Sequence, residues 1–298
     1  MTNRASPTAG RKIGAISASR SFVRGHFPLP VLLAFVAILL MAFIAIGATA
    51  LAPYDIASMD LRMRLIPPAF SQAGTWKHML GTDQLGRDVL SRLMMSVRIS
   101  LSIAVISTLI AATLGIVSGF AAAHFRGRVE QAILMMIDIQ AALPFMIVAI
   151  TILAFFGNGL TLFTLLLGLF GWERIARLSR GVAISAMEQG YSLAVFDLGA
   201  SPLRVYVRHV LPNVASTLIV AMTLNLPEVI LLESSLSFLG LGVQPPMPSL
   251  GSMVGLAREY LQSAPWLVLV PSLAIVLITL SISIIGDWLR DRLDVPGR

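Results

Sequence analysis

Long apolar segments alternate with short polar ones along most of this chain. Three of the apolar segments, residues 25–54, 99–125 and 260–286, contain no Asp, Glu, Lys or Arg. A bilayer core of roughly 30 Å needs about 20 apolar residues in a helix, because every backbone group must find its hydrogen-bond partner within the segment. The pattern therefore predicts a membrane-spanning helix in each of the three.

Two other regions predict three more spans. Residues 139–172 also lack charged side chains, but a Gly-Asn-Gly turn at 157–159 predicts two helices joined by a tight hairpin. The second of these helices is short and has to extend towards Arg177 to cross, with Arg174 and Arg177 reaching the interface. A further span is expected at about 214–238. The sequence thus predicts an all-α membrane protein with six transmembrane helices.

The basic side chains give these spans an orientation, because Lys and Arg accumulate on the cytoplasmic side of short loops. With both chain ends in the cytoplasm, most of the 22 Lys and Arg lie in inner segments. Most of the outer ones lie in one long loop that includes Arg62 and Arg98, and a long loop has little influence on orientation. The segment 191–213 is therefore predicted to face the cytoplasm.

The first 24 residues are rich in Ser, Ala, Arg and Gly and predict a mobile tail. An alternative interpretation is a cleaved signal peptide that includes the first span, because small residues at 48–52 resemble a processing site. The apolar stretch is longer than the roughly 7–15 residues of a signal peptide's apolar region. A retained membrane helix is therefore favoured.

The composition is that of an integral membrane protein, since 56% of the 298 residues are hydrophobic and only 12% are charged. The net charge of +7 is scattered between apolar segments and forms no basic patch for nucleic acid. The chain has no cysteine and no His-Glu-x-x-His sequence, and its 4 histidines lie outside the cores of the spans. We therefore expect no catalytic residue, no metal site and no intramembrane hydrolase.

Two polar segments are predicted to lie at the outer face. Residues 78–101 have turn glycines followed by apolar residues at helical spacing, which predicts an amphipathic helix along the outer surface. Residues 237–253 are dense in Gly and Pro, so they are expected to turn rather than continue as a regular helix.

The cytoplasmic segment 191–213 predicts two short helices joined by a tight turn. The first can run through Leu198, and Gly199 suits a left-handed stop. Ser201 and Pro202 then suit the N-cap and first positions of the second helix. Two interpretations fit this spacing, a docking loop for a cytoplasmic partner and an amphipathic hairpin at the membrane interface.

Three segments resemble one family of transport proteins, the dipeptide/oligopeptide/nickel permeases of binding-protein-dependent ABC importers, and specifically the second of their two membrane subunits. The segments are LGTDQLGRDVLSRL at 80–93, LGASPLRVYVRHVLPN at 198–213 and LSFLGLGVQPPMPSLG at 236–251. The resemblance covers nearly the whole chain after the tail. Gly199 followed by Leu211 and Pro212 also matches the family's cytoplasmic loop signature, which reads Glu-Ala-Ala, three residues, Gly, nine residues, Ile, one residue, Leu-Pro.

The match has departures. The Glu-Ala-Ala positions hold Leu-Ala-Val at 193–195, so the acidic contact of the signature is missing, and His209 takes the Ile position. Glu188 and Asp197 lie nearby and are candidates to replace that contact. Leu250 stands where Trp is common in the family.

The resemblance implies the fold of a type I ABC importer permease with a cytoplasmic coupling helix. It implies a tail at 1–24, the N-terminal transmembrane helix and start of the outer loop at 25–77, and a permease core at 78–298 with a coupling loop at about 187–213. In such importers the coupling helix sits in a groove of an ATPase, so closure of the ATPase dimer on ATP moves it. The residues expected to form this contact are Glu188, Tyr191, Ala194, Val195, Asp197, Leu198, Gly199, Ala200 and Ser201.

The resemblance also implies partners and a location. The partners are a related but non-identical second permease, two cytoplasmic ATPases that hold the ATP and Mg, and an extracytoplasmic substrate-binding protein. This chain binds no cofactor itself and lies in the bacterial inner membrane with both termini cytoplasmic. Peptides are the expected solute, with nickel or another small solute as the alternative. A secondary carrier is disfavoured because the chain shows no internal repeat, and a non-transporting scaffold would leave the coupling loop without a purpose.

Three acidic residues are candidates for the pathway or for structural roles. Asp138, near the cytoplasmic start of the third span, is expected to pair with an arginine rather than to contact substrate. Glu228 and Glu233 lie in or near the outer half of the fifth span. Binding of a peptide's cationic N-terminus and a role in helix capping or inter-subunit pairing both remain open for these two.

Overall fold

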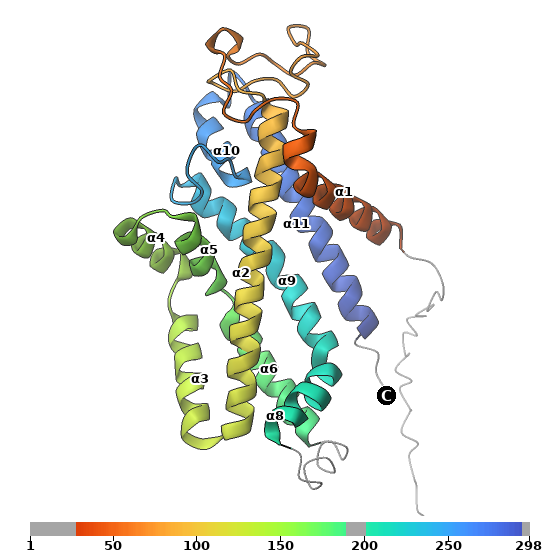
Figure 1. Cartoon of the computed structure of the whole chain (residues 1–298), viewed down its shortest axis with the longest axis vertical. Helices are drawn as coiled ribbons and strands as arrows, with labels where there is room; N and C mark the ends of the chain where they lie inside the picture. Colours follow the sequence, from red (N-terminus) through yellow and green to blue (C-terminus); the bar gives the residue numbers. More distant parts are fainter. Residues whose placement is uncertain (1–27, 189–200, 294–298) are drawn as a thin grey trace, which may run out of the picture.

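The computed structural model describes residues 28–188 and 201–293, and this part is helical apart from turns and one isolated β-bridge between Thr82 and Asp88. The predicted all-α class is therefore confirmed for the described residues. The long helices run along the molecule between a folded loop region at one end and the short helix α8 (Pro202–Val205) at the other (Figure 1).

Among the described residues, four helices are long and apolar enough to cross a membrane. They are α1 (Leu29–Leu51), α2 (Val89–Phe125), α9 (Leu211–Phe238) with the short helical segments before it, and α11 (Trp266–Leu293). Each of the four predicted uninterrupted spans falls on one of them. The rings of Phe35 and Trp288 lie 6.0 Å apart, near the start of α1 and the end of α11. The start of α1 and the end of α11 therefore lie on the same side of the molecule.

The helical hairpin predicted at 139–172 is only partly correct. The turn at 157–159 is present, but the chain around it forms four helices, α3 (Gly127–Ala142), α4 (Phe145–Phe156), α5 (Leu160–Gly168) and α6 (Trp172–Met187). A bend of 86° separates α3 from α4, which together would make a fifth span. Pro144 explains the bend, because proline lacks an N–H and forces the preceding residue out of helical geometry.

The fourth predicted span, from residue 160 towards Arg177, is divided between α5 and α6. Gly171 separates the two helices with a φ of 80°, and a Cβ there would lie 2.3 Å from Asn225 Oδ1. By length and composition, the described residues thus hold four spanning helices, or five if α3 and α4 count as one.

The prediction of an amphipathic surface helix at 78–101 is wrong. Asp88 caps the N-terminus of α2, where its carboxylate accepts the N–H of Ser91 at 2.8 Å, and α2 then runs unbroken to Phe125. The residues before Asp88 fold as turns, with Thr82 paired to Asp88. The apolar positions after Asp88 are therefore the first turns of a helix long and apolar enough to cross a membrane.

The segment after α9 is rich in glycine and proline and does not continue as a regular helix, as the sequence predicts. α9 ends at Phe238, and Gly240 has a φ of 82°. The chain stays irregular until α10 (Leu250–Ala257), which Ser249 caps and which η3 (Arg258–Tyr260) follows.

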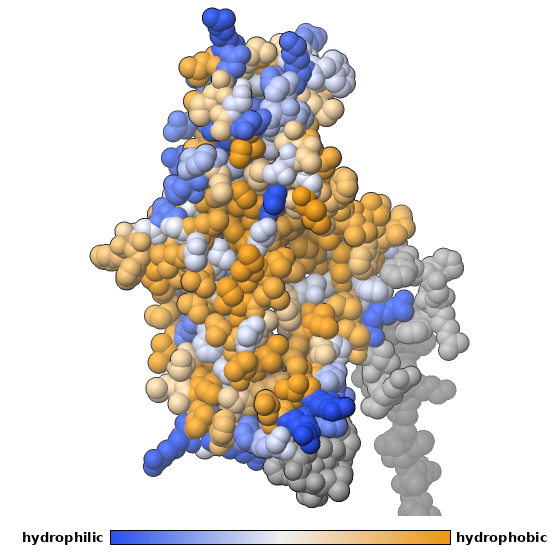
Figure 2. Space-filling model, viewed as in Figure 1, coloured by the Kyte–Doolittle hydropathy of each residue, from blue (hydrophilic) through white to orange (hydrophobic). Residues whose placement is uncertain are grey.

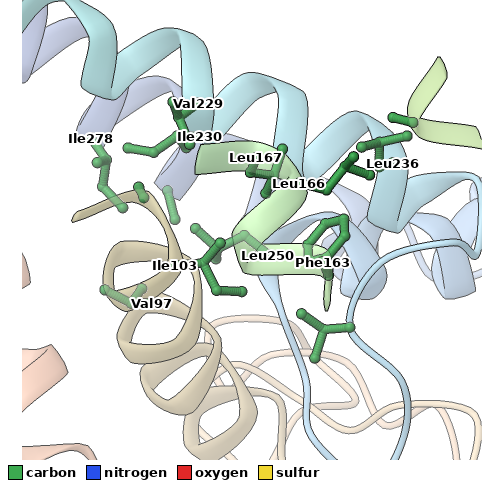
Figure 3. Close-up of a cluster of buried hydrophobic side chains, with 14 of the residues drawn as sticks. Val97, Ile103, Phe163, Leu166, Leu167, Val229, Ile230, Leu236, Leu250 and Ile278 are labelled. Carbon is green, nitrogen blue, oxygen red and sulfur yellow. The ribbon is translucent and has the colours of Figure 1, made fainter. Parts of the chain in front are cut away.

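A buried apolar core joins six of the described helices, α2, α4, α5, α9, α10 and α11 (Figure 3). Ile103 of α2 packs with Phe163 of α5 and Ile230 of α9, while α10 and α11 add Leu250 and Ile278. On the face shown in Figure 2, apolar side chains cover most of the middle, and hydrophilic ones gather towards the two ends. This surface suits a protein whose middle is surrounded by lipid.

Small residues let α2 and α6 pack closely. A Cβ on Gly119 would lie 2.5 Å from the carbonyl oxygen of Ala176, and one on Gly115 would lie 2.7 Å from the Cβ of Ile175. Neither glycine has room for a side chain, so the two helices approach almost backbone to backbone. This contact fixes α6 against the longest of the described helices.

We predict that Gly119→Ala lowers the thermal stability of the chain in detergent, because the added methyl group collides with the backbone of α6. Overpacking of this kind costs roughly 1–3 kcal/mol. Gly181→Ala is the matched control, since a Cβ there has no neighbouring atom within 4 Å. Size-exclusion chromatography after heating measures both variants, and equal stability of Gly119→Ala and wild type would contradict the close packing.

Candidate functional site

The region predicted to bind a cytoplasmic partner is described only at its two edges. Glu188 ends α6, and Ser201 precedes α8. Pro202 takes the first helical position, as predicted, but the side chain of Ser201 makes no capping hydrogen bond. The remaining predicted contact residues lie outside the described residues, and they are Tyr191, Ala194, Val195, Asp197, Leu198, Gly199 and Ala200.

Both edges of this region rest on one apolar cluster. Val205 and Val210 are fully buried, and they pack with Ala186 near the end of α6. The ring of Tyr206 lies 5.5 Å from that of Phe120 on α2. The ends of α2 and α6 and the start of α9 therefore hold the two edges together.

The opposite face of the same segment is apolar and exposed. Leu203 is 74% exposed and Val207 is 55% exposed, and an arginine follows each of them. Residues four apart on a helix lie close together, so these side chains form one small patch. A π-helical turn, η2 (Tyr206–Val210), widens the helix just before Pro212, which lacks the N–H that a regular helix would use.

Two arginines of α6 pair with carboxylates of α3. Arg180 Nε donates to Glu130 Oε1 at 2.8 Å. Arg177 Nη2 donates to Asp138 Oδ1, also at 2.8 Å. The expected pairing of Asp138 with an arginine is therefore present, and Arg177 reaches that carboxylate rather than extending alone towards the interface.

A third arginine of α6 pairs with α9. Arg174 Nη1 donates to Glu228 Oε1 at 2.8 Å, and the guanidinium carbon lies 5.4 Å from the ring centre of Phe170. The side chains of Arg174 and Glu228 are 50% and 44% exposed. Charged groups within a membrane protein usually face protein or water, so this face is unsuited to lipid. The spacing of the three arginines along one side of α6 is the sequence signal for these pairs.

Glu233 is buried inside the chain, with 0% of its surface exposed. Its carboxylate accepts Ser100 Oγ of α2 at 3.0 Å and Ser237 Oγ at 2.7 Å. Ser100 Oγ in turn accepts the N–H of Leu250, at the start of α10, at 3.2 Å. Of the roles that the sequence leaves open, this geometry favours a structural one that links α2, α9 and α10.

A second polar cluster lies in the loop before α2. Arg87 Nε donates to Asp83 Oδ2 at 2.7 Å, and His78 Nδ1 lies 3.0 Å from Asp88 Oδ1. All four residues are buried. Across residues 28–188 and 201–293, no three His, Asp or Glu side chains gather as metal ligands.

Comparison with known proteins assigns this chain to a protein family. The family model described as "Binding-protein-dependent transport system inner membrane component" matches residues 111–295, which include the α6 ion pairs and both edges of the predicted coupling loop. The chain belongs to this family. It is an inner-membrane permease subunit of an ABC transporter and is not itself an ATPase.

This permease has relatives that transport different solutes. It is 39% identical to the di/tripeptide transport system permease protein DppC of Pseudomonas aeruginosa, over 86% of this chain and 84% of that one. It is 36% identical to the nickel permease protein NikC of Escherichia coli, over 88% and 92% of the two chains. It is 34% identical to the glutathione permease protein GsiD of Pectobacterium atrosepticum, over 92% and 89%. The expected dipeptide/oligopeptide/nickel group is therefore confirmed.

The permease also resembles a solved structure, an inward-facing MetNI methionine ABC transporter. The TM-score is 0.56 at 17% sequence identity, with 68% of this chain and 96% of that chain covered. At this identity the likeness concerns the fold alone. It supports the expected ABC transporter permease fold.

We predict that Glu233→Ala destabilises the permease by about 2 kcal/mol or more, because it leaves buried serine hydroxyls without their acceptor. Glu233→Gln should cost less, since its amide oxygen still accepts and serine hydroxyls can rotate to accept as well as donate. Glu259→Ala, at an exposed carboxylate on η3, is the control. Thermal unfolding in detergent measures all three. An unchanged melting temperature for Glu233→Ala, together with lost uptake, would instead assign Glu233 to the pathway.

Proposed function

We propose that this permease forms half of the translocation path of an ATP-driven importer of di- or oligopeptides. The 39% identity to a di/tripeptide permease supports peptides as the solute class. Nickel, or another small solute such as glutathione, is the alternative, because permeases named for these are similar to nearly the same degree.

The proposed topology has six spans and cytoplasmic termini, with α5 and α6 together crossing as one broken span. The excess of basic residues in the inner segments supports this orientation. Two ATPases would then lie at the α8 end and a substrate-binding protein at the opposite end. The related second permease would cover the face that carries Arg174 and Glu228, where half-exposed charges need protein or water beside them.

The observation that carries the proposal is the course of α6. This helix of 16 residues runs from the Arg174–Glu228 pair to Glu188 at the edge of the proposed coupling loop, about 187–213. A displacement of the loop by ATPase closure is thereby transmitted along a single rigid element to the face where the path is proposed. ATP changes which side is open only if the ATPases bind the two states of the permease differently.

The exposed patch of Leu203 and Val207 fits docking better than an interfacial hairpin. An interfacial hairpin needs an apolar face wide enough to enter the bilayer. In the described part of the segment, Val205, Tyr206 and Val210 are already buried against the permease. The two exposed side chains suit a narrow groove in a partner protein instead.

We predict that Gly199→Asp abolishes most uptake while membrane insertion stays normal, because the sequence predicts that Gly199 forms the turn of the proposed coupling loop. Gly159→Asp, at the turn between α4 and α5 where a Cβ has no neighbour within 4 Å, is the control and should transport normally. Uptake of a radiolabelled dipeptide by intact cells, with glutathione and radioactive nickel in parallel, measures both variants. Normal uptake by a properly inserted Gly199→Asp protein would refute the coupling assignment.

A further inference from the structure

A cavity of about 190 Å³ lies between the end of α9 and α10. Figure 1 shows α10 at the end of the molecule opposite α8. The cavity walls come from the first turn of α2, the end of α9, the irregular segment that follows, α10 and η3. Phe238, Val243 and Met247 line it together with Arg92 and Arg258. The cavity therefore combines an apolar wall with two cations.

Arg92 is a buried arginine whose contacts are long. It is only 4% exposed, yet its Nε lies 3.6 Å from Asp83 Oδ2 and its Nη1 donates to the carbonyl of Ile56 at 3.5 Å. Arg87 Nε already donates to the same carboxylate oxygen at 2.7 Å. One carboxylate thus serves two buried arginines. A guanidinium has five N–H donors, so these contacts use only a small part of the capacity of Arg92.

The other polar side chains of the lining are engaged within the chain. Ser237 donates to Glu233 at 2.7 Å. Ser252 and Gln244 donate to nearby backbone carbonyls at 3.0 Å. Arg258, by contrast, is exposed on η3 at the rim. The groups with donors to offer a ligand are therefore the arginines.

We propose that this cavity binds the free carboxylate of a small solute that carries an apolar side chain, such as the C-terminal residue of a peptide. Guanidinium groups form strong charge-assisted bonds with carboxylates, and the apolar wall accepts the side chain. The volume is below the roughly 300–1,000 Å³ of pockets that hold drug-sized ligands, so it holds one residue rather than a whole oligopeptide. The site rests on its geometry, while its use in uptake rests on the proposed function.

Saturation-transfer NMR on the full chain in detergent measures this binding, with N-acetyl-leucine and its uncharged analogue N-acetyl-leucinamide as probes. We expect the acid to bind at least about tenfold more tightly than the amide, because only the acid makes charge-assisted bonds. Arg258→Gln should weaken binding of the acid by about tenfold and leave the amide unchanged. Arg62→Gln, at an exposed arginine outside the cavity lining, is the control.

Equal binding of acid and amide, or unchanged binding of the acid by Arg258→Gln, overturns the proposal. So does loss of binding-protein association in Arg258→Gln without any binding of the acid, which would assign the arginines to protein docking. Arg258→Gln is used instead of a variant of Arg92 because Arg92 is buried, so its replacement would also disturb the fold. The binding assay needs neither ATPase nor transport, so absence of carboxylate binding would not contradict the proposed function. Conversely, normal uptake by Gly199→Asp would contradict the coupling assignment without affecting carboxylate binding.

Discussion

The close packing of α2 against α6 is the contact on which the rest of this permease depends. Gly115 and Gly119 leave no room for side chains between the two helices, and Gly168 brings α5 equally close to Ile110 of α2. Apolar side chains gain little from association in lipid, so close backbone approach and polar bonds between helices take over that role. The register of α6 on α2 then decides which carboxylates its arginines can reach.

The ion pairs of the α6 arginines follow from that register. These arginines pair with α3 nearer the proposed coupling loop and with α9 farther from it, so a single helix connects two neighbouring helices to that loop. The Arg174–Glu228 pair stays half exposed, whereas much of the surface in Figure 2 is apolar. The permease thus separates a face suited to a partner or to water from faces suited to lipid. The carboxylate of Glu233 lies on neither kind of face, because it is buried among α2, α9 and α10.

The uninterrupted spans could be predicted from the sequence because their length and lack of charge determine them almost alone. The bend at Pro144 was missed, although a proline inside a helical pattern favours one. The break at Gly171 depends on the close approach of Asn225 from α9. The continuity of α2 was missed because apolar periodicity does not tell a surface helix from the outer end of a span. The ion pairs join residues 39 to 54 positions apart, so they required the tertiary fold. The loop signature at 193–212 identified the family despite its departures, although the structure describes it only from residue 201 onwards.

Affinity purification from native membranes in mild detergent, followed by mass spectrometry, tests most directly whether the α8 end of this permease docks an ATPase. The wild-type chain should recover a second permease and ATPase subunits. Leu203→Asp, at a side chain 74% exposed on α8, should lose the ATPases and keep the second permease. Met59→Asp, at a 58% exposed side chain of the outer loop, should keep both. Recovery of the folded chain alone, or equal ATPase recovery with Leu203→Asp, would contradict the account.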